Sequence, residues 1–224
     1  MNCSDEIVGL YERHAEEFNR DRSRTLQEKV WLDRFISLVR PSGVVLDIGC
    51  GMAEPIARYL LDTGFQVVGI DSSPTLIQLA QARFPGSEWI VADMRQLELG
   101  RSFHGILAWD SFFHLRQSDQ RDMFPRFASH AAPGAPLMFT SGPAHGEITG
   151  SYCGEPLYHG SLSPAEYESL LGSNGFEVLA HLANDPDCGE HTVWLARFGQ
   201  GEGAAQPDEL VRRAKRPFHF PYII

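Results

Sequence analysis

Four apolar segments of the chain each end at or beside an aspartate. The segments are VVLDIG, FQVVGID, EWIVAD and FHGILAWD, and their acids are Asp47, Asp71, Asp93 and Asp110. If the segments are neighbouring parallel strands, their carboxyl ends share one rim of a sheet, where the ligands of such sheets bind. Four like charges at one rim repel each other unless a partner compensates them. The acids therefore predict a site for a ligand that carries positive charge.

A glycine turn follows the first of these segments, in the run VLDIGCGMAEP. Gly49 and Gly51 stand where a dinucleotide-binding turn brings its backbone close to a pyrophosphate, but Glu54 takes the place of the third glycine. Asp47 and Glu54 would repel a pyrophosphate, whereas they would attract a sulfonium and an ammonium group. S-adenosylmethionine carries both groups, and an acid at the end of the second strand, here Asp71, can hold its ribose.

These residues must be positioned by alternating strands and helices. Apolar runs that are nearly continuous alternate with helical patterns around 54–63, 74–83, 118–131 and 164–173, which favours a parallel sheet covered on both faces. The last two strands, FEVLAHLA and TVWLARF, are joined by the short turn NDPDCGE and should be antiparallel. We predict an α/β fold with a Rossmann-like seven-stranded, mostly parallel sheet, helices on both faces, an antiparallel last strand and an N-terminal helical cap.

The cap is predicted from two helical patterns over residues 4–39. One apolar stripe holds Ile7, Leu10, Tyr11, His14 and Phe18, and the other holds Val30, Trp31, Phe35 and Leu38. We divide the chain into a helical cap (1–40), one α/β domain (41–198) and a tail (199–224) that ends in the basic and aromatic run RRAKRPFHFPYII.

Composition limits the partners. The 224 residues carry a net charge of −10, which disfavours nucleic acid and anionic membranes because those surfaces require clustered Lys and Arg. The four cysteines form no CxxC pair, so no metal site is expected. No apolar run is long enough to cross a membrane, and the start MNCSDE is unlike a signal peptide. We expect a cytoplasmic protein without nucleic-acid or membrane partners, as a monomer or homodimer.

Residues 40–142 resemble the class I S-adenosylmethionine-dependent methyltransferases that act on small molecules. VLDIGCG resembles their first motif, and VVGIDSSPTLIQLAQAR, WIVADM and FHGILAWDSFFHL resemble the next three, in order. The resemblance implies a methyltransferase domain over 41–198, with S-adenosylmethionine as donor and S-adenosylhomocysteine as product. It implies that the cofactor lies on the backbone of the glycine turn, with acids at its ammonium, ribose and adenine. The implied cofactor-binding residues are Asp47, Gly49, Cys50, Gly51, Asp71, Ser72, Asp93, Met94 and Asp110. Glu54 and Pro55 depart from the family pattern at the start of the next helix.

The acceptor is predicted from what surrounds this rim. His114, four residues after Asp110, is the candidate general base because the pKa of histidine lies near neutrality; the alternative is a histidine packed among aromatic side chains. The glycine-rich segment 141–162 is expected to be a mobile wall or lid, or else a solvated connection. The predicted acceptor-binding residues are Tyr11, Phe18, Phe113, His145, Tyr152, Tyr158 and His159. The alternative for Tyr11 and Phe18 is that they are core residues.

The reaction is predicted by elimination. No NPPY-like run and no cysteine follow the fourth strand, so a small-molecule oxygen or nitrogen atom is the favoured acceptor. Two alternatives are a non-catalytic module that only binds S-adenosylmethionine and an NAD(P)-dependent Rossmann oxidoreductase. Asp47 and the missing third glycine disfavour the second of these.

Overall fold

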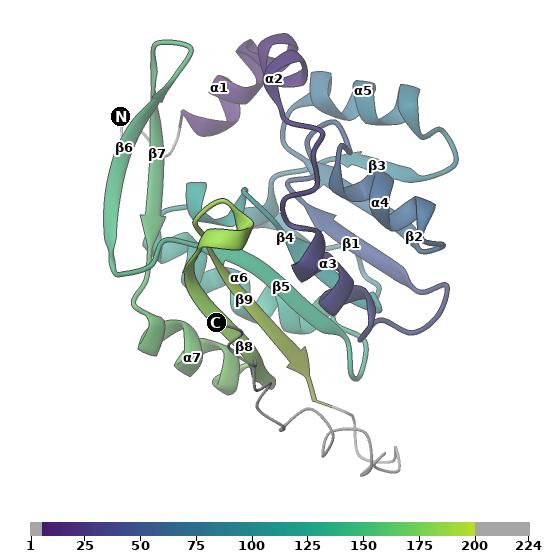
Figure 1. Cartoon of the computed structure of the whole chain (residues 1–224), viewed down its shortest axis with the longest axis vertical. Coiled ribbons are helices and arrows are strands. Elements are labelled where there is room, and N and C mark those ends of the chain that lie inside the picture. The colour runs from purple at the N-terminus through teal and green to yellow at the C-terminus, as the bar shows by residue number, and fades with distance from the viewer. Residues whose placement is uncertain (1–5, 200–224) are drawn as a thin grey trace, which may run out of the picture.

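The computed structural model describes residues 6–199 and is built around a seven-stranded sheet (Figure 1). The strands of this sheet are β1 (Val44–Ile48), β2 (Gln66–Asp71), β3 (Glu88–Val91), β4 (Gly105–Ala108), β5 (Pro136–Ser141), β8 (Phe176–Asp185) and β9 (His191–Phe198). Their order is β3-β2-β1-β4-β5-β9-β8. The first five strands in this order pair in parallel, whereas β9 is antiparallel to both of its neighbours. The predicted sheet and its antiparallel last strand are confirmed.

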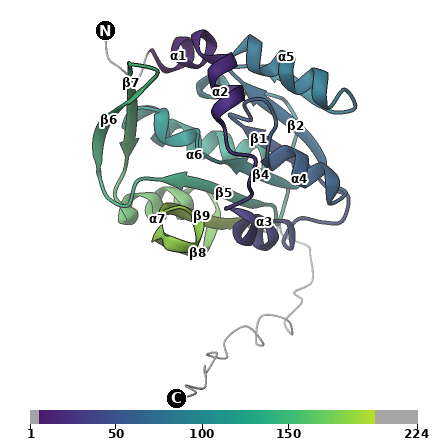
Figure 2. The same ribbon diagram turned by 45° about the horizontal axis from the view of Figure 1, so that its top comes forward.

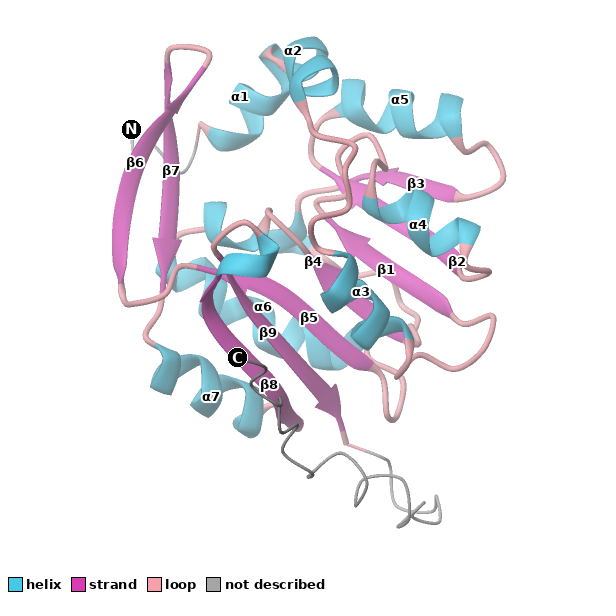
Figure 3. Ribbon diagram, viewed as in Figure 1, coloured by secondary structure: helices cyan, strands magenta, loops and turns pink. Residues whose placement is uncertain are grey.

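Helices cover both faces of this sheet (Figure 3). They are α1 (Ile7–Arg13), α2 (Ala15–Asp21), α3 (Lys29–Ile36), α4 (Ile56–Asp62), α5 (Pro74–Arg83), α6 (Gln117–His130) and α7 (Pro164–Ser173). Successive residues of a strand point to opposite faces. Val45 accordingly packs in one core with α3, α4 and α5, and Leu46 packs in the other with α6 and α7. Two apolar layers therefore hold the parallel strands, which fixes the rim where they end.

Of the predicted cap, α1 and α2 lie beside α5 (Figure 2), whereas α3 packs in the core against β5. The first predicted helix is interrupted at His14, where α1 ends and α2 begins. Glu12 ties the cap to the start of α5, because its carboxylate accepts hydrogen bonds from the Ser73 hydroxyl and from the Thr75 amide and hydroxyl. The second predicted stripe is wrong for Val30, which is 65% exposed because successive helical residues point in different directions.

Segment 141–162, expected to be a mobile wall or lid or else a solvated connection, forms a β-hairpin over most of its length. Its strands β6 (Gly146–Tyr152) and β7 (Glu155–Ser161) pair in antiparallel register outside the main sheet. Cys153 and Gly154 form the two-residue turn with φ angles of +49° and +82°. Positive φ at both turn residues matches the twist of paired strands. Glycine residues lower the tendency of a segment to form a strand, and the favourable turn outweighs this effect in the hairpin.

Candidate functional site

The turn after β1 brings bare backbone to the rim of the sheet. Gly49 and Gly51 have φ angles of +75° and +54°, in the region that favours glycine. A Cβ atom on Gly49 would lie 2.3 Å from the Cβ atom of Ser111. The amides of Gly49 and Cys50 donate to the carbonyl oxygen of Ile70 at 2.8 and 3.0 Å. The turn is therefore fixed against β2 and leaves room for a ligand directly over the main chain.

Asp71, the last residue of β2, is tied to this turn. Its carboxylate accepts hydrogen bonds from the amides of Gly51 and Ser73, both at 2.9 Å. Burial raises the pKa of Asp71, and these hydrogen bonds offset part of the rise. Each carboxylate oxygen has a second lone pair, so Asp71 can still accept hydrogen bonds from a ligand.

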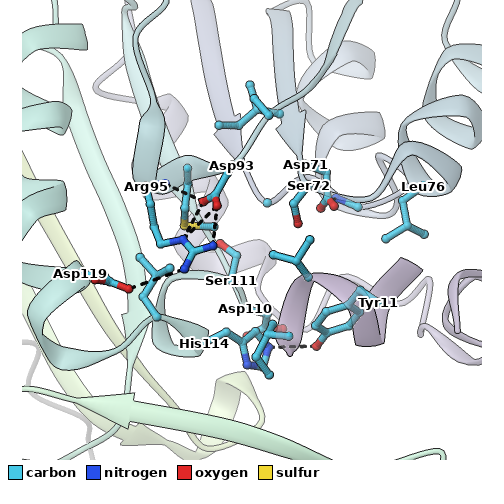
Figure 4. A pocket seen from close by; sticks show the side chains of 18 of the residues that line it. Tyr11, Asp71, Ser72, Leu76, Asp93, Arg95, Asp110, Ser111, His114 and Asp119 are labelled. Carbon is cyan, nitrogen blue, oxygen red and sulfur yellow. Dashed lines mark hydrogen bonds and ion pairs between the residues drawn. The ribbon is translucent and has the colours of Figure 1, made fainter. Parts of the chain in front are cut away.

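Asp71 faces a cavity that we call the first chamber (Figure 4). The rim of the sheet contributes Asp71, Ser72, Asp93, Met94 and Ser111, the cap contributes Ile7, Val8 and Tyr11, and apolar side chains such as Leu76, Ala92 and Leu115 fill the wall between the acids. Asp93 lies two residues beyond β3, where it accepts from the amide of Arg95 and pairs with its guanidinium at 2.6 Å. The first chamber is thus a largely apolar slot whose lining also includes four carboxylates, those of Asp71, Asp93, Asp110 and Asp119.

A second chamber lies on the other side of the glycine turn. It is lined by Arg22, Asp47, Cys50, Trp109, Phe113, Leu157, His159 and His191, among others. Six residues line both chambers, namely Tyr11, Phe18, Gly49, Gly51, Asp110 and His114. The two cavities therefore meet at the glycine turn, beneath the cap.

Asp110 is held rigidly at this junction. It has a φ of +50°, which a residue with a side chain rarely adopts, and such outliers persist where the surroundings impose them. Its carboxylate pairs with Nη1 of Arg22 at 3.1 Å and with Nε2 of His191 at 2.8 Å. Burial alone would raise the pKa of Asp110, but His191 and Arg22 hold it below its usual value. Asp110 is therefore an anion with both oxygens engaged.

Asp47 is the deepest acid of the site. It lies within β1 and is 4% exposed. Burial, reinforced by the charge of Asp71 and partly offset by Arg22, raises its pKa to about 7. A ligand cation would favour the ionised form and lower this pKa.

His114 has both ring nitrogens engaged. Nδ1 lies 2.9 Å from the carbonyl oxygen of Tyr158, so Nδ1 carries the proton and donates it. Nε2 then accepts a hydrogen bond from the hydroxyl of Tyr11 at 2.9 Å (Figure 4). Burial lowers the pKa of His114 to about 4, and burial also raises the pKa of Tyr11. The pair is therefore neutral and fixed in one tautomer.

Comparison with known proteins identifies the family. The profile of a family described as "Methyltransferase domain" matches residues 45–134, the part of the chain that contains the glycine turn and the four rim acids. A solved structure of magnesium protoporphyrin IX methyltransferase from Synechocystis PCC 6803 with bound S-adenosylmethionine has the same fold, with a TM-score of 0.66 over 89% of this chain and 98% of that chain at 17% identity. Residues 45–134 are a methyltransferase domain, and the protein is a methyltransferase that uses S-adenosylmethionine.

Two sequence relatives of this methyltransferase extend beyond the common motifs. Trans-aconitate 2-methyltransferase of Azoarcus sp. (strain BH72) is 27% identical over 93% of each chain. The dTDP-3-amino-3,6-dideoxy-alpha-D-glucopyranose N,N-dimethyltransferase of Streptomyces fradiae is 30% identical over 58% of this chain and 51% of that chain. Both relatives are named as methyltransferases, and the oxidoreductase alternative is not supported.

The chemistry of the site fits S-adenosylmethionine. The first chamber combines an apolar slot for a planar base with the carboxylate of Asp71, and the bare turn of Gly49 and Gly51 lies where the two chambers meet. Asp47 and Asp110 place negative charge next to the turn, where a cation would be stabilised. Between residues 6 and 199, no helix is long and apolar enough to cross a membrane, and no cluster of His, Cys, Asp or Glu could hold a metal ion.

The structure brings most of the predicted site residues of the methyltransferase together, with three exceptions among the predicted acceptor contacts. Phe113 and His159 line the second chamber, whereas His145 lines only a neighbouring hollow beside the hairpin, which shares Phe113 and His159 with that chamber. Tyr152 stacks on Tyr11 of the cap with ring centroids 6.2 Å apart. Tyr158 is only 3% exposed, because alternate residues of β7 point inward. His145, Tyr152 and Tyr158 are thus not lining residues of either chamber.

Sequence reasoning missed several lining residues. Arg22 lies in the turn after α2 and His191 at the start of β9, yet both contact Asp110. They are 88 and 81 residues away from it along the chain, so no local pattern connects them. Trp109, which also lines the second chamber, could have been predicted from the sequence because it directly precedes the rim acid Asp110.

Proposed function

We propose that this methyltransferase transfers the methyl group to an oxygen or nitrogen atom of a small molecule bound in the second chamber. The observation that carries the proposal is the meeting of two chambers at the glycine turn. One chamber suits the adenosine part of the cofactor, and the other leaves space for an acceptor on the far side of the turn. Holding the two reactants in line at this junction is the main task of the protein.

The proposed cofactor contacts follow the two chambers. Asp71 with Ser72 holds the ribose hydroxyls, and Asp93 with Met94 borders the adenine. The backbone of Gly49, Cys50 and Gly51 supports the methionine part, whose ammonium faces Asp47. These assignments use the open lone pairs of carboxylates that are already held in place.

The residues above the turn have proposed positioning roles. Tyr11 and Phe18 close the junction from the cap with their rings in edge contact, with centroids 5.3 Å apart. His114 orients the Tyr11 hydroxyl, and Asp110 links Arg22 and His191 across the junction. Phe113 and His159 form the acceptor wall on the hairpin side.

The wider setting remains as predicted from sequence. We propose a helical cap over 1–40 and a methyltransferase domain over 41–198; the predicted tail (199–224) lies outside the described residues except for its first residue. A small-molecule acceptor, no nucleic-acid partner, a cytoplasmic location and a monomer or homodimer complete the proposal.

Calorimetry and a transfer assay test this function together. S-adenosylmethionine and S-adenosylhomocysteine should bind the full chain, whereas NADH should not. Methyl-labelled S-adenosylmethionine is then incubated with trans-aconitate, with a dTDP-amino sugar and with fractions of a metabolite extract, and the labelled product is analysed by NMR. Label on oxygen or nitrogen supports the proposal. Cofactor binding without transfer to any fraction would indicate a binding module, and label on carbon or sulfur would contradict the predicted acceptor atom.

A further inference from the structure

Most titratable groups in the second chamber are already committed to protein partners. Both oxygens of Asp110 are paired, and Glu54 pairs with three arginines. Burial raises the pKa of the Cys50 thiol, which keeps it protonated. The hydroxyl of Tyr11 donates to His114. None of these groups has a free basic lone pair suited to taking a proton from an acceptor.

The two histidines nearest Asp110 are committed as well. His114 uses Nδ1 as a donor and Nε2 as an acceptor. His191 donates through Nδ1 to the carbonyl oxygen of Cys188 at 2.6 Å and through Nε2 to Asp110 at 2.8 Å. An imidazole that donates from both nitrogens is protonated, and the hydrogen bond to Asp110 accordingly raises the pKa of His191. Neither ring can act as a base in this arrangement.

His159 differs from both. It lies on β7 and lines the second chamber, and no group within residues 6–199 hydrogen-bonds to either of its ring nitrogens. Its ring packs against Phe113 and His114, with centroids 4.9 Å from each, and those two rings are themselves 4.8 Å apart. His114 lies at the junction of the two chambers, where methyl transfer is proposed. The ring of His159 is therefore in contact with a residue of that junction.

The electrostatic surroundings keep this imidazole neutral. Burial lowers the pKa of His159 below its usual value, and the negative charge of Asp110 offsets part of the shift. The other charged groups of the chamber are Asp47 from β1, Glu54 from the glycine turn, Arg22 from the cap and His191 from β9. Arg22 and His191 pair with Asp110, Glu54 pairs with three arginines, and Asp47 is the acid proposed to face the cofactor ammonium. A neutral imidazole with free nitrogens is a competent proton acceptor near pH 7.

We propose that His159 is the general base of the reaction, and hence that the acceptor is a molecule whose nucleophilic atom carries a proton, such as a hydroxyl or an ammonium group. This inference rests on the proposed function. The acceptor atom gives its proton to a ring nitrogen of His159 and its electron pair to the methyl carbon, while the electrons of the carbon–sulfur bond leave with sulfur. The products are the methylated acceptor, the neutral thioether and the imidazolium of His159, which returns its proton to solvent on its exposed side.

A chemical test of His159 needs neither cofactor nor acceptor. Diethyl pyrocarbonate acylates unprotonated, accessible imidazole nitrogens, and peptide mass spectrometry locates the products on the full chain. His159 should react at pH 7 at least about ten times faster than His114, whose nitrogens are both bonded. Equal, slow labelling of the two histidines would overturn the proposal by showing that His159 has no available nitrogen.

The kinetic test uses an acceptor identified by the transfer assay. His159→Gln should lower kcat by roughly 100-fold to 10,000-fold and remove the acidic limb of its pH profile, while S-adenosylhomocysteine affinity stays within twofold. The matched control is His181→Gln, on β8 against Trp194 outside both chambers. Turnover within threefold of wild type with an unchanged pH profile, or transfer only to atoms that carry no proton, would overturn the assignment. Absence of cofactor binding by the wild-type chain would instead refute the proposed function itself, and the labelling result separates the two failures.

Discussion

The rim of the sheet and the cover above it are built by different physical means. At the rim, β4 and β5 are buried along their whole length, and β1 is buried from Val45 onward. In the cover, which we define as α1, α2 and the β6–β7 hairpin, β6 is exposed over most of its length, and Ile148 is 71% exposed. Two large apolar cores hold the rim in place, whereas the cover is held by a small apolar cluster of Ala15, Met52 and Leu76 together with polar and aromatic side chains.

The same difference appears in the acids of the two regions. Burial raises the pKa values of Asp47 and Asp71 at the rim. In the cover, hydrogen bonds from Arg13 and His14 lower the pKa of Glu155 to about 2. The ionised forms of the rim acids are thus disfavoured until a cation binds beside them. In the cover, the ionised form of Glu155 is stabilised by Arg13 and His14. This contrast suits a preformed cofactor site under a part that opens for exchange of ligands.

The largest effect is expected at the rim, from Asp71→Asn. The amide replaces one of the carboxylate oxygens with a donor, which opposes the amide of Gly51 or Ser73 and removes the charged partner of the ribose hydroxyls. We expect a loss of S-adenosylhomocysteine affinity of about 100-fold, from about 3 kcal/mol of charged hydrogen bonding, measured by calorimetry. The matched control is Asp62→Asn, at an exposed residue that ends α4. A loss below fivefold would mean that Asp71 does not face the cofactor.

A smaller effect should follow from the pKa of about 7 at Asp47. The ammonium of the cofactor binds the ionised carboxylate, so affinity should rise with pH up to about 7, by at most about tenfold per unit, and then level off. Binding below pH 7 should release a proton, which calorimetry in two buffers of different ionisation enthalpy detects. Asp47→Asn should flatten this pH dependence. Proton uptake on binding would reverse the sign and contradict the placement of the ammonium.

The rim was predictable from sequence because its signals are local. An apolar strand, an acid at its end and a following helix recur within about thirty residues, and a parallel sheet brings such ends to one edge. Asp93 and Asp110 lie two residues beyond their strands, which the apolar runs alone did not fix. Both acids still lie at the predicted edge of the sheet, because Asp93 lines the first chamber and Asp110 lines both chambers.

The cover was less predictable because its contacts join distant segments. The hairpin depends on two positive φ angles at Cys153 and Gly154, which outweigh the glycines along its strands. The environment of His114 depends on the hydroxyl of Tyr11, 103 residues away, and on a carbonyl of the hairpin. A histidine suited by its type to base catalysis is therefore fully bonded, and only the fold reveals that His159 has free ring nitrogens among the three histidines that line the two chambers.

The smallest effect is expected in the cover, from Glu155→Gln. Arg13 and His14 of the cap both contact this one carboxylate on the hairpin. The contacts are exposed, so their loss should change the midpoint of unfolding little. Cover opening is local, however, and we expect the dissociation rate of S-adenosylhomocysteine to rise about threefold to fivefold in stopped-flow measurements.

Salt and a second variant make this last comparison decisive. Screening weakens exposed pairs, so the wild-type dissociation rate should rise with salt, and the rate of Glu155→Gln should depend on salt less. Arg13→Gln combined with Glu155→Gln should add little to the single change, because both remove the same pair. Glu177→Gln, which removes an exposed pair with Arg197 on the far strands, is the control. Equal dissociation rates for wild type and Glu155→Gln at low salt would show that ligand exit does not pass through the contact between cap and hairpin, and the division into a fixed rim and an opening cover would have to be redrawn.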